Sequence, residues 1–313
     1  MAAIEVVTVT ANPALDQTVW VPGFRAGEVN RAVRDETSPG GKGVNVAAFL
    51  AGFGVNVAAT GFLGRANAGF FEEFLAGRGI APCFIPVDGV TRTGIKIVDD
   101  DGGTTTDVNF PGFAVSGAEL SALEEVVGRL AAPGRWLVLA GSLPREAPAA
   151  TYRRLAEIVH AAGGWVAVDT SGPALAEALA AGPDLVKPNR VELEELGGRA
   201  LPDLASLRAA AGDLAAGGVE TVVVSLGSEG ALFVRGGEAV FARPPAVRVA
   251  STVGAGDAMV AGTIVGLRRR LPLDGVAAVA TACSAVAIAR VGPHLDAGAV
   301  EATVDQVKVE RVG

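Results

Sequence analysis

Short apolar runs alternate with longer amphipathic stretches along most of the chain. The apolar runs predict strands at residues 4–10, 55–62, 136–140, 165–169, 185–187 and 221–226. The amphipathic stretches predict helices near residues 43–53, 67–78, 117–131, 148–162, 173–181, 191–197 and 203–217. Strands separated by helices of this length are typical of an α/β fold with a mainly parallel sheet, in which ligands bind beyond the carboxyl ends of the strands.

Two segments interrupt this alternation. Residues 17–22 with 28–36, and residues 92–99 with 104–109, are β-rich and hairpin-like, and the Asp- and Gly-rich residues 99–103 supply the second turn. We expect these pieces to form a small sheet that covers the active site and excludes water from it. Such a lid also offers a face to a second copy of the chain, which predicts a homodimer.

Composition excludes several classes of protein. The chain has 313 residues, 50% of them hydrophobic, but its apolar runs are interrupted well before the ~18 residues that a membrane span needs. The first residues lack a basic region and lead directly into a strand, so we expect no signal peptide. Two distant cysteines, Cys83 and Cys283, indicate reduced thiols in a cytoplasmic protein without a disulfide or zinc framework.

Charge and histidine content narrow the function further. A net charge of −8 disfavours nucleic-acid binding. The three arginines at 268–270 are more typical of cations at the end of a helix than of a nucleic-acid patch. With only His160 and His294, the chain is a poor candidate for histidine-centred catalysis or metal binding.

Residues 251–257 (Ser-Thr-Val-Gly-Ala-Gly-Asp) open an apolar helix and carry the most specific chemistry. A helix start exposes backbone N–H groups and partial positive charge, and Gly254 and Gly256 let an anion approach closely. An acid at this place suits a general base: Asp257 would take a proton from a hydroxyl while the amides stabilise a transferring phosphoryl group. The alternative is a glycine-rich turn in which Asp257 merely complements the helix dipole.

A second glycine-rich cluster, residues 39–47, leads into the first predicted helix. It lacks the spacing of a P-loop or a dinucleotide-binding fingerprint. A structural turn explains its glycines but leaves Lys42 and Asn45 unexplained. With the preceding Asp16, these side chains could bind the hydroxyls of a polyol.

Residues 40–47 and 251–257 together resemble the two signatures of the ribokinase-like carbohydrate kinases. The chain is most similar to one branch, the bacterial 1-phosphofructokinases, through motifs at residues 12–16, 27–30, 91–96, 108–113, 141–144, 186–189 and 225–230. The resemblance covers residues 4–295, and tagatose-6-phosphate kinases and a minor class of 6-phosphofructokinases share much of it. It implies one domain over residues 1–313, a three-layer α/β/α fold with a mainly parallel sheet, and a β lid inserted at about 16–37 and 91–110.

The resemblance also assigns roles to individual residues. Asp257 corresponds to the catalytic base, and Gly254, Ala255 and Gly256 correspond to the anion hole. The sugar side comprises Asp16, Gly40, Gly41, Asn45 and Ser142. Arg92 corresponds to the residue that binds the existing phosphate, as its guanidinium fork suits phosphate oxygens. Lys42, Arg31 and Lys96 are further candidates for that phosphate, and each could equally be a solvated surface residue.

On the nucleotide side, residues 225–230 resemble the loop that borders the ATP phosphates, and they also read as a hairpin turn. This loop contributes Ser225, Leu226, Gly227, Ser228, Glu229 and Gly230, and Lys187, Asn189 and Gly256 complete the ATP site. Glu192 matches the family residue that helps to hold Mg²⁺, which retains waters and takes few protein carboxylates. A solvated residue at a helix start is the competing interpretation of Glu192.

The resemblance thus implies phosphorylation of fructose 1-phosphate by ATP at the C6 hydroxyl, with Mg²⁺. A tagatose-6-phosphate kinase or a 6-phosphofructokinase is the alternative within the family, because nothing in the residues decides which end of the ketose carries the phosphate. The alternative from another class is a non-catalytic sensor of sugar phosphates or nucleotides. A sensor, however, needs no general base.

Overall fold

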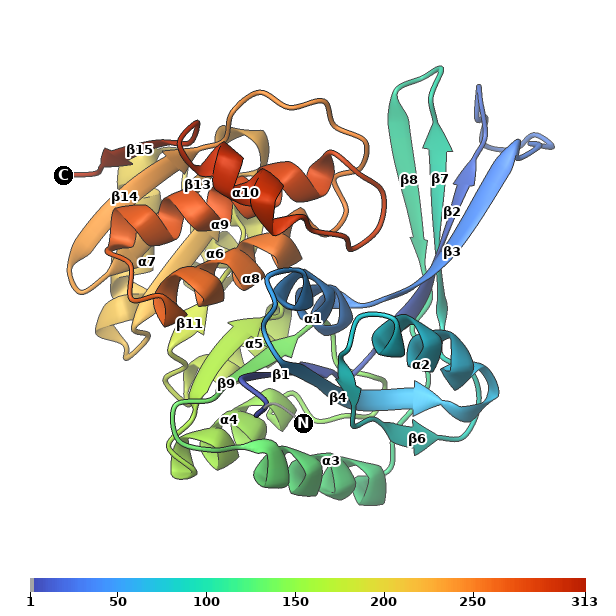
Figure 1. Cartoon of the computed structure of the whole chain (residues 1–313), viewed down its shortest axis with the longest axis horizontal. Coiled ribbons are helices and arrows are strands. Elements are labelled where there is room, and N and C mark those ends of the chain that lie inside the picture. The colour runs from blue at the N-terminus through green and yellow to red at the C-terminus, as the bar shows by residue number, and fades with distance from the viewer. Residues whose placement is uncertain (1–2) are drawn as a thin grey trace.

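Two sheets organise the computed structural model, which describes residues 3–313 (Figure 1). In the larger sheet the strands follow the order β15-β14-β13-β12-β11-β10-β9-β1-β4-β5, and β6 pairs with β4. Its parallel strands are β1 (Val6–Thr10), β4 (Val57–Gly64), β5 (Ala81–Pro82), β6 (Ile85–Val87), β9 (Trp136–Ala140), β10 (Trp165–Asp169), β11 (Leu185–Val186) and β12 (Thr221–Ser225). The hairpin of β13 (Ala231–Arg235) and β14 (Glu238–Arg243), followed by β15 (Lys308–Arg311), forms an antiparallel edge.

Helices cover both faces of this sheet and make three layers. One face carries α1 (Lys42–Gly52), α2 (Ala68–Ala76), α8 (Ala255–Arg268), α9 (Leu273–Ile288) and α10 (Ala297–Val304). The other carries α3 (Gly117–Leu130), α4 (Thr151–Ala161), α5 (Gly172–Leu179), α6 (Arg190–Gly197) and α7 (Leu204–Ala216). Successive strand residues point to opposite faces, so Val138 of β9 joins the first core while Leu137 and Leu139 join the second.

The smaller sheet is the predicted lid. Its strands β2 (Ala14–Trp20), β3 (Arg34–Gly40), β7 (Thr93–Asp99) and β8 (Thr104–Asn109) pair in the order β3-β2-β7-β8. Figure 1 shows these strands projecting from the main body beside α1 and α2. The pairing of β2 with β7 is parallel and joins two segments that are far apart in the sequence.

The first half of the lid differs from its predicted bounds. Strand β2 begins at Ala14 rather than at residue 17, and β3 begins at Arg34 rather than at residue 28. The ladder continues to the pair Ala14 and Gly40, at the base of the lid, because the glycine-rich turn extends the sheet there. Between the strands, Asn30 donates to the carbonyls of Arg25 and Glu28 and folds the segment into a loop.

Other predicted elements lie within a few residues of their observed bounds. A capping box begins α3, with Ser116 Oγ accepting from the Glu119 N–H at 3.3 Å. Helices α9 and α10 and strands β5, β6, β14 and β15 were not predicted from the sequence. Helix α9 is buried on most sides, so its Ala- and Val-rich sequence lacks the polar stripe that marks an amphipathic helix.

Helices α8 and α9 pack closely because glycines replace side chains at their contact. A Cβ atom on Gly262 would lie 2.7 Å from Cys283 Sγ, and one on Gly266 would lie 3.0 Å from the Cα of Val276. Of the three arginines that end α8 and follow it, Arg268 pairs with Glu5 and Arg269 pairs with Glu301. Within residues 3–313, none of the helices is long and apolar enough to cross a membrane.

Candidate active site

Helix α8 begins at the carboxyl edge of the larger sheet, and its first turn is the centre of the site. Gly254 precedes the helix with a φ of 82°, a left-handed conformation that glycine adopts without a steric penalty. Within residues 3–313, no carbonyl or side chain accepts a hydrogen bond from the N–H groups of Gly256 or Asp257. These donors at a positive helix end form a place for an anion.

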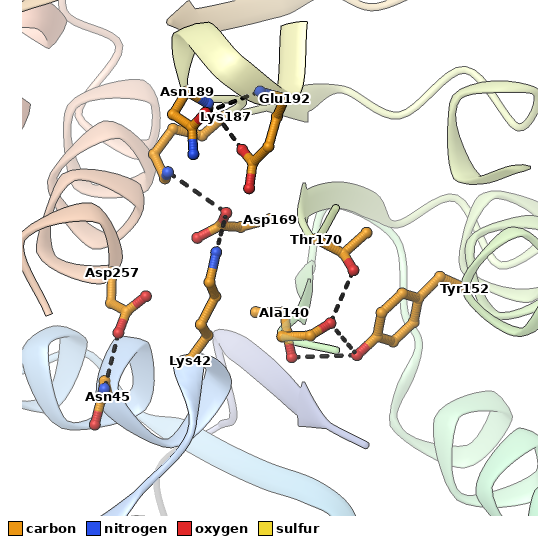
Figure 2. A network of polar contacts seen from close by, with 11 residues as sticks. Lys42, Asn45, Ala140, Tyr152, Asp169, Thr170, Lys187, Asn189, Glu192 and Asp257 are labelled. Carbon is orange, nitrogen blue, oxygen red and sulfur yellow. Dashed lines mark hydrogen bonds and ion pairs between the residues drawn. The ribbon is translucent and has the colours of Figure 1, made fainter. Parts of the chain in front are cut away.

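Asp257 is buried in this first turn beside helix α1. Asn45 of α1 donates from Nδ2 to Asp257 Oδ2 at 2.8 Å, which joins the two glycine-rich clusters that lie 212 residues apart in the sequence (Figure 2). Burial, and then the nearby Asp169 carboxylate, raise the pKa of Asp257 to about 6. Lys42, the Asn45 amide and Lys187 act in the opposite direction. A carboxylate with this pKa is mostly ionised at neutral pH and can still accept a proton.

Asp169 also belongs to the site, although the sequence did not predict it. It ends β10, and its fully buried Oδ1 lies 2.9 Å from Lys42 Nζ and 3.4 Å from Lys187 Nζ. Burial works to raise the pKa of Asp169, but Lys187 and Lys42 hold it below its ordinary value. The sequence did contain a signal: a carboxylate at the carboxyl end of a predicted central strand, where ligands bind in such folds.

On the lid side, a small cavity of about 30 Å³ lies between the lid and the start of α8. Asp16 of β2 and Lys96 of β7 contribute to its lining with Asn45 and Gly254, and the Lys96 ammonium lies 3.8 Å from Asp16 Oδ1. Burial raises the pKa of Asp16 against the lowering effect of Lys96 and Arg92. The predicted polyol-binding residues Asp16 and Asn45 therefore do share one cavity.

On the other side of the helix start lies a larger cavity of about 390 Å³. Its lining includes the predicted nucleotide-side residues Asn189, Ser225, Gly227, Ser228, Gly230 and Gly256, together with Ala255. An apolar wall from Met259, Ala285 and Ile288 was not predicted, because it comes largely from α9. Since Gly254 lines the first cavity and Ala255 and Gly256 line the second, the start of α8 separates the two.

A capping box positions Glu192 at the start of α6. Asn189 accepts from the Glu192 N–H at 2.9 Å, and Glu192 Oε2 accepts from the Asn189 N–H at 2.8 Å. Within the described chain, no group of three His, Cys, Asp or Glu side chains could hold a metal ion. Mg²⁺ does not require such a cage, because it usually retains waters and binds one or two carboxylates plus substrate phosphates. A half-buried Glu192 fits that mode of binding.

Several predicted sugar-side residues lie at the base of the lid. Arg92 donates to the carbonyls of Phe110 at 2.9 Å and Asn12 at 3.3 Å. Asn12 in turn donates to Ser142 Oγ at 3.1 Å. The backbone before Ser142 is held by Tyr152, whose hydroxyl donates to the carbonyls of Ala140 and Gly141 (Figure 2).

The two predicted sugar-side glycines lie where side chains would collide. A Cβ atom on Gly40 would lie 2.8 Å from Asp16 Cγ, and Gly41 has a φ of 109°. Both glycines thus let the start of α1 approach the lid and the site.

Four other candidates lie apart from the cavities or point elsewhere. Arg31 is exposed in the loop between β2 and β3 and lines neither cavity. Lys42 pairs with Asp169 instead of lining the lid-side cavity. Leu226 packs against the core, and Glu229 lies 3.6 Å from Arg190.

Comparisons with known proteins agree with this geometry. Residues 6–297 match the model of the pfkB family carbohydrate kinases. The chain belongs to this family. It is 50% identical over 293 residues to a 1-phosphofructokinase of Rhodobacter capsulatus, covering 93% of each chain. It is 39% identical to a 1-phosphofructokinase of Escherichia coli K12, covering 91% of each.

Solved structures of pfkB-type kinases have the same fold. Phosphofructokinase-2 of Escherichia coli, solved in complex with substrates and products, superposes with a TM-score of 0.92 at 30% identity, over 97% of this chain and 99% of that chain. This pfkB-family protein is therefore an ATP-dependent carbohydrate kinase, with the ribokinase-like α/β architecture that the sequence predicts.

The buried charge of Asp257 predicts a gain in stability when it is removed. Asp257→Asn should raise the free energy of unfolding at pH 7.5 by about 1–3 kcal/mol, because a pKa raised from 3.8 to about 6 reflects the cost of burying the carboxylate. As the folded-state pKa is the raised one, this cost is absent below about pH 4, grows as the pH rises to about 6, and then stays constant. Urea unfolding of both proteins at pH 4 and pH 7.5 measures the difference. Equal free energies of unfolding for the parent and Asp257→Asn at pH 7.5 would contradict a cost of burying this carboxylate.

Proposed function

We propose that this kinase transfers the γ-phosphoryl group of ATP to the C6 hydroxyl of fructose 1-phosphate, giving fructose 1,6-bisphosphate and ADP. One observation carries the proposal: the Asp257 carboxylate and free backbone amides lie at the helix start that separates the two cavities. The curated relatives that are 39–50% identical and named 1-phosphofructokinase support this acceptor.

In this mechanism Asp257 acts as the general base. Its carboxylate accepts the proton of the attacking hydroxyl, which displaces ADP in line from the γ-phosphorus. The free N–H groups of Gly256 and Asp257 meet the negative charge on the transferred phosphoryl group. Asn45 orients the carboxylate through its 2.8 Å hydrogen bond and favours the ionised form.

The nucleotide would lie in the larger cavity, with the loop at residues 225–230 along its phosphates. The adenine would pack against the apolar wall that α8 and α9 form in this cavity. The Lys187 ammonium lies close to Gly256, on the side of the phosphates. Glu192 would hold Mg²⁺ through water near Asn189. When bound, this ion neutralises charge on the nucleotide phosphates.

The acceptor would lie under the lid. Asp16 would accept a hydrogen bond from a sugar hydroxyl, helped by Asn45, Ser142 and the backbone at Gly40 and Gly41. Arg92 would bind the existing phosphate with the donors not used by backbone carbonyls, and Lys96 would contribute further positive charge.

A panel of four acceptors tests the assignment. With MgATP, we expect kcat/KM to be highest for fructose 1-phosphate. It should be lower for fructose 6-phosphate and tagatose 6-phosphate, and lowest for unphosphorylated fructose. A coupled assay of ADP release measures all four. Preference for a 6-phosphate would assign the alternative reaction of the family. No ADP with any acceptor would leave a non-catalytic sensor.

Replacing the proposed base tests the mechanism. Asp257→Ala should lower turnover by about 10²–10⁴-fold while changing the KM for either substrate little, because general-base catalysis acts in the transition state. In the parent enzyme, turnover should halve near pH 6 as Asp257 becomes protonated, since only the ionised form accepts a proton. Steady-state kinetics between pH 5 and pH 8 measure both effects.

A matched control uses another acid in the first turn of a helix. Asp274 occupies that place in α9 but is exposed. Asp274→Ala should therefore leave turnover unchanged. Near-normal turnover in Asp257→Ala would refute the general-base role.

We further propose a homodimer formed through the lid. The lid and its loops expose four large apolar side chains outside the main body: Val29, Val33, Val108 and Phe110. Light scattering of the parent protein should give twice the mass of one chain. The double variant Val33→Asp, Val108→Asp should give a mass closer to that of one chain, because the charges disrupt the apolar contact. Trp165→Gln, which changes an exposed apolar residue of the main sheet, should not. A parent protein with the mass of one chain would contradict the dimer.

A further inference from the structure

Asp169 connects two lysines that come from different parts of the chain. Lys42 begins α1, and Lys187 follows β11, yet both ammonium groups lie within 3.4 Å of the same oxygen, Asp169 Oδ1 (Figure 2). Lys187 is 5% exposed and the Asp169 side chain is fully buried, whereas the Lys42 side chain is 39% exposed. A long lysine side chain has many rotamers, so a shared buried anion restricts where both charges can be.

The lysines are held beside the start of α8. A Cβ atom on Gly256 would lie 3.2 Å from Lys187 Nζ, so this ammonium lies against the proposed anion hole. Lys42 is near enough to Asp257 for that carboxylate to raise its pKa. Burial works to lower the pKa of Lys42, but Asp169 and Asp257 outweigh it. Asp169 therefore holds both ammonium groups close to the proposed place of phosphoryl transfer.

A purely structural role explains this arrangement poorly. Burying an ion costs several kcal/mol, and a buried pair often stabilises a protein no more than apolar residues of similar volume do. Here the buried charges lie at the carboxyl edge of the sheet, next to the cavities, rather than inside either hydrophobic core. Such placement favours a catalytic benefit over a contribution to stability.

We propose that Asp169 is a positioning residue for phosphoryl transfer, which holds the Lys42 and Lys187 ammonium groups against the first turn of α8 and sets the charge around Asp257. The inference rests on the proposed function. Asp169 acts through the two lysines and the base rather than by contact with a substrate.

The charged groups that face Asp257 come from three places in the fold. Helix α1 contributes Lys42, with the neutral Asn45, and strand β10 ends at Asp169. Lys187 follows β11. Where α9 contacts the first turn of α8, its side chain is the neutral Ser284, which donates to the Ala255 carbonyl. The buried thiol of Cys283 faces Gly262, further along α8.

Asp169→Asn tests the role in three measurements on the full-length enzyme. Turnover should fall by about 10²-fold, the order found when a preorganised partner of developing charge is lost. The KM for ATP should rise by about tenfold, since a hydrogen bond between charged groups contributes about that much. The acid limb of the pH profile, where turnover falls as Asp257 becomes protonated, should move to lower pH. Asp257 would lose a repelling carboxylate and would be attracted by two lysines that are no longer neutralised.

Asp184→Asn is the matched control. Asp184 lies at the opposite end of the same strands, where its carboxylate accepts from the Val166 N–H at 2.6 Å and contacts His160 at 3.1 Å. This control should lose stability but keep the parent acid limb and KM. A parent-like acid limb and KM for ATP in folded Asp169→Asn would overturn the proposal.

A charge-balanced pair keeps the test valid if Asp169→Asn alone does not fold. Asp169→Asn with Lys42→Met removes one charge of each sign, so we expect it to fold. In the Lys42→Met background, Asp169→Asn should lower turnover by less than it does in the parent, because part of its effect acts through Lys42. If Asp169→Asn lowered turnover by the same factor in both backgrounds, the proposal that Asp169 positions Lys42 would be overturned. The acceptor panel tests the proposed function separately. If the parent enzyme released no ADP with any acceptor, the proposed function would be contradicted, whereas the comparison of variants tests only the role of Asp169.

Discussion

Buried charge at the carboxyl edge of the sheet is the constraint on which the site depends. The carboxylates of Asp169 and Asp257 and the ammonium of Lys187 are almost inaccessible to water, and Lys42 reaches the same group from the start of α1. Burying any one of them alone would be strongly unfavourable, because a low-dielectric interior disfavours uncompensated charge. The two lysines and Asp169 therefore have to come together in one place.

That requirement explains why the elements around the site pack as they do. Helix α8 has to begin beside α1 for Asn45 to reach Asp257, and strands β10 and β11 have to end beside that helix start. Glycines at 262 and 266 allow α9 to approach α8 and to form the apolar wall of the larger cavity. Helix packing and site geometry are thus coupled through α8.

The balance of charges also separates the roles of the two carboxylates. Two lysines hold the pKa of the buried Asp169 below its ordinary value. Burial, and then the repulsion of Asp169, raise the pKa of Asp257 to about 6 against the weaker opposing effects of Lys42, the Asn45 amide and Lys187. Two acids of the same type thereby become a permanent anion and a group that can exchange a proton near neutral pH. Their different environments, rather than their identity, make the difference.

Local sequence was sufficient for the central strands and most helices, because period, capping residues and turn residues act over a few positions. It also identified Asp257, Asn45 and the helix start, since glycines beside polar groups are locally unusual. It could not find α9, whose apolar sequence has no polar stripe, or the true bounds of β2 and β3, which a pairing at the base of the lid decides.

The sequence by itself determined the α/β class, the glycine-rich start of α8 and the existence of a lid. Only the tertiary structure decided that Lys42 pairs with Asp169, that Arg31 lies apart from both cavities and that one helix start separates them. These features depend on contacts between segments more than 100 residues apart in the chain, as the 127 residues between Lys42 and Asp169 illustrate. Such contacts follow from how the helices and strands pack, which no local pattern of residues encodes.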